Sequence, residues 1–225
     1  MTYTKQTLAK TFDHTFLKAY ATNADLERLC QQAKEIDAAM VAINTEWTKF
    51  CKEQLKGSDV HVGAAISFPL GQSGLKSKLD ECRNAIEDGA DEIDYVIHIG
   101  KAKMHDWDYL KKEMEEMVSL CHASNKICKV IFENCYLEKE EIKALAEIAK
   151  EVKPDFIKTS TGFGTGGATV EDVKLMVETV QGEVKVKAAG GIRDWKTCKA
   201  MLEAGAQRIG TSSSLKILEE FEAQA

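Results

Sequence analysis

The stretch DFIKTSTGFGTGG, residues 155–167, resembles the end of a buried strand that opens into a glycine-rich loop. Lys158 follows two large apolar residues where the strand should end, and small, hydroxylated or glycine residues follow it. Pro154 precedes the stretch, as expected at a strand start, because proline has no N–H to donate to a sheet. A lone lysine here is more often a solvated strand cap than a nucleophile, so this stretch by itself leaves both interpretations open.

The stretch VKVKAAGG, residues 184–191, repeats the pattern with Lys187. Two lysines where successive apolar strands run into glycine indicate a site. Outward from these two stretches, apolar runs alternate with segments whose apolar residues recur at helical spacing. The runs that we interpret as strands are residues 11–16, 40–44, 60–68, 92–97, 127–132, 156–157, 184–188 and 208–210.

These eight strand–helix units predict the fold. Strand starts mostly ~20–35 residues apart require a parallel sheet with right-handed crossovers. Eight units in 225 residues fit a single (β/α)8 TIM barrel spanning residues 1–225, because such barrels usually have about 250 residues. An open, doubly wound α/β sheet is the alternative, although no G-x-G-x-x-G follows the first strand.

A barrel predicts functional residues at the carboxyl ends of its strands. Polar residues, proline and glycine stand at or near these predicted ends: Asp13, His14, Asn44, Pro69, Gly71, Glu133, Asn134, Lys158, Lys187 and Gly210.

Composition limits the partners. A formal charge of −6 argues against nucleic acid, whose phosphates are held by clustered Lys and Arg, but it allows a small anionic substrate. The N-terminus has no apolar h-region, and no apolar run approaches the length of about 18 residues that a membrane span needs. The seven cysteines are scattered and never spaced C-x-x-C, which favours reduced thiols and a cytoplasmic protein. The five histidines show no metal-ligand spacing, so we expect no metal.

Lys158 and Lys187 should lie on adjacent strands, about 4.8 Å apart. Two ammonium groups ~4 Å apart repel by ~4 kcal/mol at an effective dielectric near 20, which would lower one lysine pKa by about three units. A neutral lysine in a dry pocket attacks carbonyl groups and forms a Schiff base. Asp94, an acid within an apolar run, must be paired to be tolerated there. It is either a structural partner of Lys187 or a group that shuttles protons, and both roles are compatible.

Two loops have the composition of phosphate sites. Residues 189–193 (AGGIR) follow the seventh predicted strand, and residues 209–214 (IGTSSS) follow the eighth and open the last helix. Glycines let backbone N–H groups approach an anion, and a helix N-terminus attracts it. Barrels often bind phosphate between strands seven and eight.

The motifs DHTFLK (13–18), FPLG (68–71), GADEIDYVIHIG (89–100), KTSTGFGTGGAT (158–169), VKAAGGIR (186–193) and GAQRIGTSS (205–213) together resemble deoxyribose-phosphate aldolase. The resemblance covers nearly the whole chain. It implies a class I aldolase with a (β/α)8 barrel, no cofactor and commonly a homodimer. It also implies cleavage of 2-deoxy-D-ribose 5-phosphate to acetaldehyde and D-glyceraldehyde 3-phosphate.

By motif, the resemblance implies that Lys158 forms the Schiff base, that Lys187 lowers its pKa and relays protons, and that Asp94 exchanges protons through water. The implied substrate- and phosphate-binding residues are Gly162, Gly190, Gly191, Arg193, Gly210, Ser212 and Ser213, with Asp13 and Thr161. Departures from the family pattern are Ala189 for Ser, His98 for Asn, and the absence of any tyrosine after Tyr136. An isomerase that uses an acid/base pair, and a sugar-phosphate binder without activity, remain alternatives.

Overall fold

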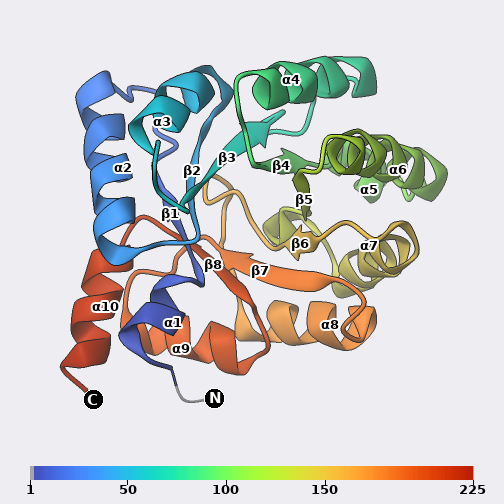
Figure 1. Ribbon diagram of the computed structural model, residues 1–225. Coiled ribbons are helices and arrows are strands. Elements are labelled where there is room, and N and C mark those ends of the chain that lie inside the picture. The colour runs from blue at the N-terminus through green and yellow to red at the C-terminus, as the bar shows by residue number, and fades with distance from the viewer. Residues whose placement is uncertain (1–2, 225) are drawn as a thin grey trace.

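A computed structural model describes residues 3–224, and its eight strands form one closed parallel barrel in chain order (Figure 1). The strands are β1 (Phe12–Thr15), β2 (Met40–Asn44), β3 (His61–Ile66), β4 (Glu92–Val96), β5 (Ile127–Ile131), β6 (Phe156–Lys158), β7 (Lys185–Ala189) and β8 (Arg208–Thr211). Pairing of β1 with β8 closes the sheet. The predicted (β/α)8 barrel is therefore confirmed, and the open sheet is excluded.

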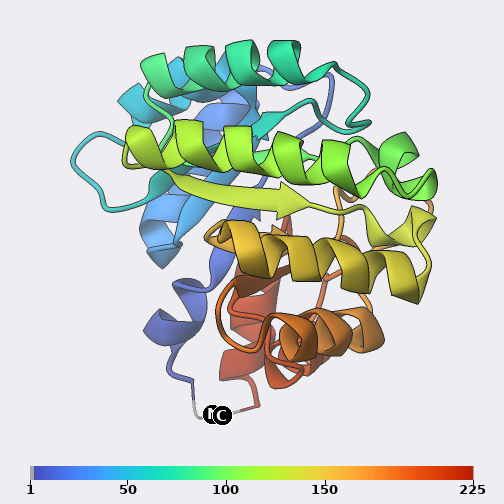
Figure 2. The ribbon, with the colours of Figure 1, turned by 90° about the vertical axis from the view of Figure 1, so that its right-hand side faces the viewer.

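Helices cover the outside of the barrel, as Figures 1 and 2 show. After each strand in turn come α2 (Asn23–Ile36), α3 (Thr48–Gln54), α4 (Leu75–Glu87), α6 (Trp107–Ala123), α7 (Lys139–Val152), α8 (Val170–Val180), α9 (Trp195–Glu203) and α10 (Ser214–Glu222). Their apolar faces pack against outward-facing strand residues such as Ile93, Val130 and Ile157, which are fully buried. The apolar core thus lies between the barrel and the helices. No helix within residues 3–224 is long and apolar enough to cross a membrane.

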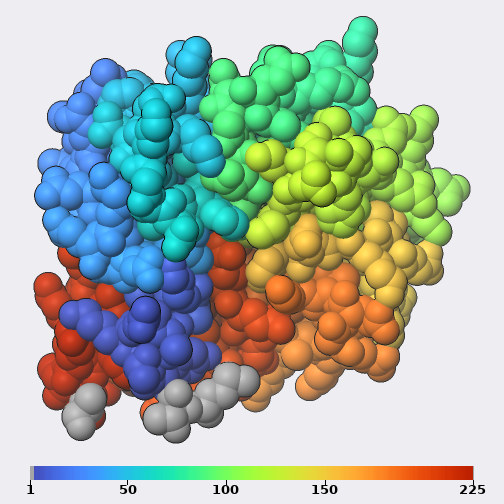
Figure 3. Space-filling model, viewed as in Figure 1, coloured from blue at the N-terminus to red at the C-terminus, as the bar shows by residue number. Residues whose placement is uncertain are grey.

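Two short helices were not among the predicted elements. The first, α1 (Lys5–Ala9), precedes β1 and packs against α10, so that both ends of the described chain lie side by side (Figure 3). The second, α5 (Ile99–Lys103), follows β4, and the His98 ring nitrogen accepts the Lys101 backbone N–H at its start. Both helices have only five residues, too few for helical periodicity to appear in the sequence.

The strand register places charged side chains inside the barrel. Asp94 is the register partner of Lys129, Lys158 of Lys187, and Lys187 in turn of Arg208. Partners across a parallel sheet project to the same face, and here that face is the barrel interior. The interior of this barrel is therefore charged, and its carboxyl-terminal end is the place to look for chemistry.

Candidate active site

Three of the predicted residues meet in the barrel interior. The Lys158 ammonium donates to Oδ2 of Asp94 at 2.9 Å, and the Lys187 ammonium donates to the same oxygen at 2.6 Å. All three side chains are nearly inaccessible to solvent. Lys158 is the last residue of β6, so its side chain alone among the three borders the open end of the barrel.

A second tier of charges lies around these three, and of its members only Asp13 was among the predicted site residues, as a substrate-binding residue. Lys129 donates to Oδ1 of Asp94 at 2.6 Å and is also ion-paired with Glu92. Asp13 is ion-paired with Lys187 and accepts from Nε of Arg208 at 2.7 Å. The Arg208 guanidinium also donates to Glu92. The network is therefore continuous from the barrel floor to Lys158.

The charges of this network do not balance if every lysine is protonated. Its basic members are Lys129, Lys158, Lys187 and Arg208, and its acidic members are Asp13, Glu92 and Asp94. Four cations face three anions, and all seven side chains are at most 11% exposed. Buried charges are tolerated when they are paired, so one lysine is favoured in its neutral form. Lys158, which has the fewest acidic neighbours, is the member that loses its proton at least cost.

The pKa of Lys158 is lowered, as expected if this lysine is the one favoured in its neutral form. Burial is the largest cause of its shift, and together with the charges of Lys187 and Lys129 it lowers the pKa of Lys158 to about 8 against the opposing effect of Asp94. The predicted direction agrees, and the predicted repulsion from Lys187 contributes to it, but desolvation is the larger cause. Burial would raise the pKa of Asp94, but the lysines around it hold that pKa well below its usual range.

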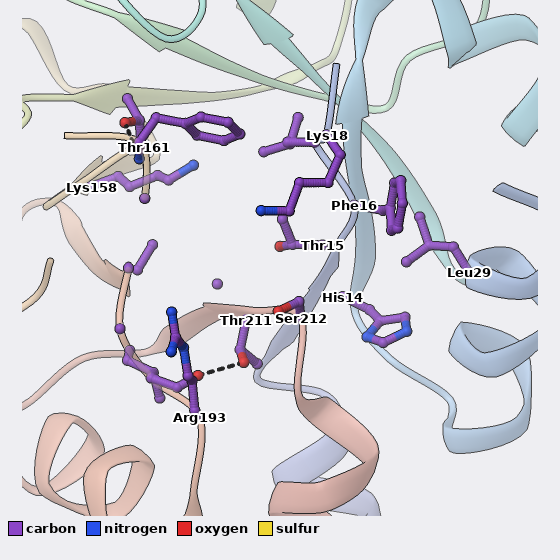
Figure 4. Close-up of a pocket in the computed structure, with 18 of the residues that line it drawn as sticks. His14, Thr15, Phe16, Lys18, Leu29, Lys158, Thr161, Arg193, Thr211 and Ser212 are labelled. Atoms are coloured by element: carbon purple, nitrogen blue, oxygen red, sulfur yellow. Dashed lines mark hydrogen bonds between the residues drawn. The ribbon is translucent and has the colours of Figure 1, made fainter. Parts of the chain in front are cut away.

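A cavity of about 390 Å³ opens above Lys158, and its wall consists of residues at the carboxyl ends of β1, β6, β7 and β8 and of one face of α2 (Figure 4). Among the predicted substrate-binding residues, the ones that line it are Thr161, Gly162, Gly190, Gly191, Arg193, Gly210 and Ser212. These residues come from sequence positions up to 51 apart, and the barrel brings them to one opening. A cavity of about 390 Å³ has room for a small phosphorylated sugar.

Two predicted substrate-binding residues lie elsewhere. Asp13 is fully buried beneath the cavity, where it is paired with Lys187 and Arg208. It is therefore part of the charge network and not of the cavity wall. Ser213 is the N-cap residue of α10, and its backbone N–H donates to Thr211 Oγ1 at 2.9 Å. It stands beside the wall residue Ser212 but does not line the cavity.

Two glycines of the cavity wall are required for different structural reasons. A Cβ at Gly210 would approach the Ala189 Cβ to 2.9 Å and the Lys187 Cε to 3.2 Å, so a side chain there would displace Lys187. Gly190 has a φ of +84° and its Cα lies close to the backbone of Gly162 and Gly167. Only glycine adopts that conformation at no steric cost.

Glu133 holds the loop that follows Lys158. It is buried, and its two carboxylate oxygens accept from the backbone N–H of Thr161, at 3.1 Å, and from the Thr161 hydroxyl. The Thr161 hydroxyl oxygen in turn accepts the N–H of Phe163 at 3.0 Å. Asn134 donates its backbone N–H to Thr159 at 2.8 Å. The end of β5 therefore fixes the glycine-rich loop.

Comparison with known proteins identifies this barrel. A family model described as DeoC/LacD family aldolase matches residues 7–220. The chain belongs to the DeoC/LacD family of aldolases. The resemblance drawn from the sequence motifs is thereby confirmed, and so is the assignment of the chain as an enzyme.

The similarity to known proteins covers almost the whole chain. A deoxyribose-phosphate aldolase of Lactobacillus acidophilus is 61% identical over 217 residues, which cover 96% of this chain and 92% of the relative. One from Bacteroides thetaiotaomicron is 51% identical over 214 residues, 95% and 90% of the two chains. A solved structure, described as a unique tetrameric deoxyribose phosphate aldolase from Aeropyrum pernix, superposes with a TM-score of 0.90 at 30% identity and covers 99% of this chain and 94% of that one.

Proposed function

We propose that this aldolase cleaves 2-deoxy-D-ribose 5-phosphate reversibly to acetaldehyde and D-glyceraldehyde 3-phosphate through a Schiff base on Lys158. The observation that carries the proposal is one buried lysine, with its pKa lowered to about 8, that borders a cavity lined by glycine-rich loops. A lysine with this pKa is partly unprotonated near neutral pH, whereas an ordinary lysine is almost entirely charged.

The reaction begins when the neutral Lys158 amine adds to C1 of the open-chain sugar. The carbinolamine loses water and leaves an iminium ion. A base then removes the proton of the C3 hydroxyl, the C2–C3 bond breaks, and its electrons neutralise the iminium to give an enamine. D-Glyceraldehyde 3-phosphate leaves, C2 of the enamine takes up a proton, and water hydrolyses the new iminium to acetaldehyde and free Lys158.

We assign proton exchange to Asp94 and Lys187, acting through a water molecule. In the free enzyme, Oδ2 of Asp94 accepts from both lysines. An iminium nitrogen carries one N–H where an ammonium carries three, so formation of the Schiff base releases part of the hydrogen bonding to this oxygen. Lys187 keeps its contacts with Asp94 and Asp13, which holds the Asp94 carboxyl group in place while it accepts and returns a proton.

We assign the phosphate to the wall formed by the loops after β7 and β8, with Gly162 facing them from the loop after β6. Ser212 and the glycines present backbone N–H groups there, and Arg193 contributes a charge. Backbone N–H groups at loops of this kind bind phosphate without requiring a metal ion. The homodimer that the family resemblance implies stays a prediction, as does the location of the enzyme in the cytoplasm.

The proposal is tested by product identification. The protein is incubated with 2-deoxy-D-ribose 5-phosphate, and the products are followed by proton NMR. We expect acetaldehyde and D-glyceraldehyde 3-phosphate in equal amounts, and no reaction with Lys158→Met. A single isomerised sugar phosphate, or substrate that stays intact, would exclude aldol cleavage.

A further inference from the structure

The cavity wall carries a cation that is not among the predicted site residues. Lys18 lies in the loop between β1 and α2 and lines the cavity. Its ammonium is 5.8 Å from the centre of the Phe163 ring. Figure 4 shows the Lys18 side chain extending into the cavity from the β1 side, while Lys158 extends toward it from the opposite side. The two lysines therefore face each other across the space that a substrate would fill.

The other cations of the wall show why Lys18 is available to a ligand. Arg28 donates to Asp25 at 2.6 Å, and Lys158 donates to Asp94 at 2.9 Å. Within residues 3–224, neither Lys18 nor Arg193 forms an ion pair with an acid. Two uncompensated positive charges thus project from separate loops of one cavity, in a protein whose formal net charge is −6.

Phe163 holds Lys18 in this place only weakly. The ring is half exposed and packs edge-on against Phe68, with 5.4 Å between the ring centres. A cation over an exposed aromatic ring is held by a modest attraction. A phosphate oxygen binds an ammonium more strongly, because the hydrogen bond joins two opposite charges. The ammonium can therefore move from the ring to an anion in the cavity.

We propose that Lys18 is a substrate-binding residue that contacts the phosphate of the substrate across the cavity from Arg193 and sets the preference for phosphorylated over unphosphorylated sugars. The inference rests on the proposed function in one respect, namely that the substrate is a sugar phosphate. The glycine loops supply directed N–H groups but no net charge, so a dianion bound there needs cations. Arg193 supplies one and Lys18 supplies the second.

The test compares Lys18→Met, which keeps the apolar stem and removes the charge, with Lys18→Arg, which keeps the charge. Lys174→Met is the matched control, because Lys174 is exposed on α8, outside the cavity wall. Calorimetric titration with glycerol 3-phosphate measures anion binding without any Schiff-base chemistry. We expect Lys18→Met to weaken this binding about tenfold or more, the value of a hydrogen bond to a charged group, and Lys18→Arg and Lys174→Met to retain it.

Kinetics with two substrates separate binding of the phosphate from general damage. Lys18→Met should lower kcat/KM for 2-deoxy-D-ribose 5-phosphate about tenfold or more and leave that for 2-deoxy-D-ribose within about twofold. Equal losses on both sugars, or unchanged glycerol 3-phosphate binding in Lys18→Met, would overturn the assignment. The Schiff base is tested separately, by reduction with borohydride in the presence of acetaldehyde. If Lys18→Met loses glycerol 3-phosphate binding while this treatment of the parent protein leaves no adduct on Lys158, the proposed chemistry is wrong and the role of Lys18 stands.

Discussion

Lys158 and Lys187 are direct register partners on neighbouring parallel strands, and their ammonium groups donate to one and the same carboxylate oxygen of Asp94. Lys187 is fully enclosed and also paired with Asp13, whereas Lys158 borders the cavity. Two lysines related by the sheet register therefore differ in environment. Lys187 holds this carboxylate as well as that of Asp13, whereas Lys158 borders the cavity with its pKa lowered to about 8, and we propose that it is the lysine that reacts.

The first prediction concerns the pH dependence of the parent enzyme. In the proposed mechanism Lys158 reacts as the free amine, and burial is the main cause that lowers its pKa to about 8. The free-amine fraction rises with pH until that value is passed, so kcat/KM should rise about tenfold per pH unit below pH 8 and level off above it. Steady-state rates between pH 6 and about 9.5 measure this profile. A rate that falls with rising pH over this range would contradict the assignment of Lys158 as nucleophile.

The second prediction concerns Lys187→Leu. Removing this cation abolishes its repulsion of Lys158 and leaves Asp94 freer to hold the Lys158 proton, and both effects raise the pKa of Lys158. The ascending limb of the pH profile should therefore move to higher pH, with a strong loss of kcat at pH 7 and partial recovery at high pH. If the limb keeps its position and the rate stays low at every pH, Lys187 acts through proton transfer alone.

The third prediction concerns stability and Lys129. Lys129→Met removes a fully buried cation and leaves Glu92 and Asp94 with less compensation. Breaking a buried pair in this way costs about 3–5 kcal/mol in the free energy of unfolding. Lys111→Met is the control, because its pair with Glu151 is exposed and such pairs contribute at most about 1 kcal/mol. Urea unfolding measures the free energy of unfolding of both variants. If Lys129→Met loses as little stability as Lys111→Met, the buried Asp94 does not need Lys129 as its counterion.

The fourth prediction concerns Glu133, which holds Thr161 by two hydrogen bonds. Glu133→Gln leaves only one side-chain acceptor for two donors, and an unsatisfied buried polar group costs about 1–3 kcal/mol, or roughly five- to hundredfold in rate if it misplaces the loop. Thr161→Ser keeps both hydrogen bonds and should behave as the parent, whereas Thr161→Val should resemble Glu133→Gln. Separate measurement of kcat and KM shows whether Glu133 positions the loop. If Glu133→Gln has the kinetics of the parent enzyme, Glu133 has no role in the active site.

The eight strands and the residues Lys158, Lys187 and Asp94 could be predicted from the sequence, because each produces a local sequence pattern. Alternation of apolar runs with helical periodicity gave all eight strands, and a lysine before glycine marked Lys158 and Lys187. Asp94 was noticeable because an acid within an apolar run requires a partner. These residues depend on the character of their own strands, which a linear pattern records.

The second tier of charges depends on register, which a linear pattern does not record. Lys129 lies within an apolar run as Asp94 does, yet a long lysine can also extend from a strand to solvent, so its position alone carries little information. A signal was present in Glu92 and Asp94, two residues apart and hence on one face of β4. Two acids on one buried face require cations on the neighbouring strand, and Lys129 is the only basic residue of β5.

The cause of the Lys158 shift and the position of Lys18 also required the fold. Desolvation, the largest cause, is a property of the closed barrel and its cavity, so repulsion from Lys187 was the only cause visible in the sequence. Lys18 lies on a loop that meets Phe163 only when β1 and β6 belong to one barrel. No spacing rule links residues that are 145 positions apart.

The Schiff base that we propose between Lys158 and the substrate aldehyde can be trapped with sodium borohydride, which reduces it to a stable amine. The protein is treated with acetaldehyde and borohydride, and the modified residue is located by peptide mass spectrometry. We expect irreversible inactivation with a single ethyl adduct on Lys158, and no adduct in Lys158→Met. An adduct on Lys187, or full activity after treatment with no adduct, would contradict it.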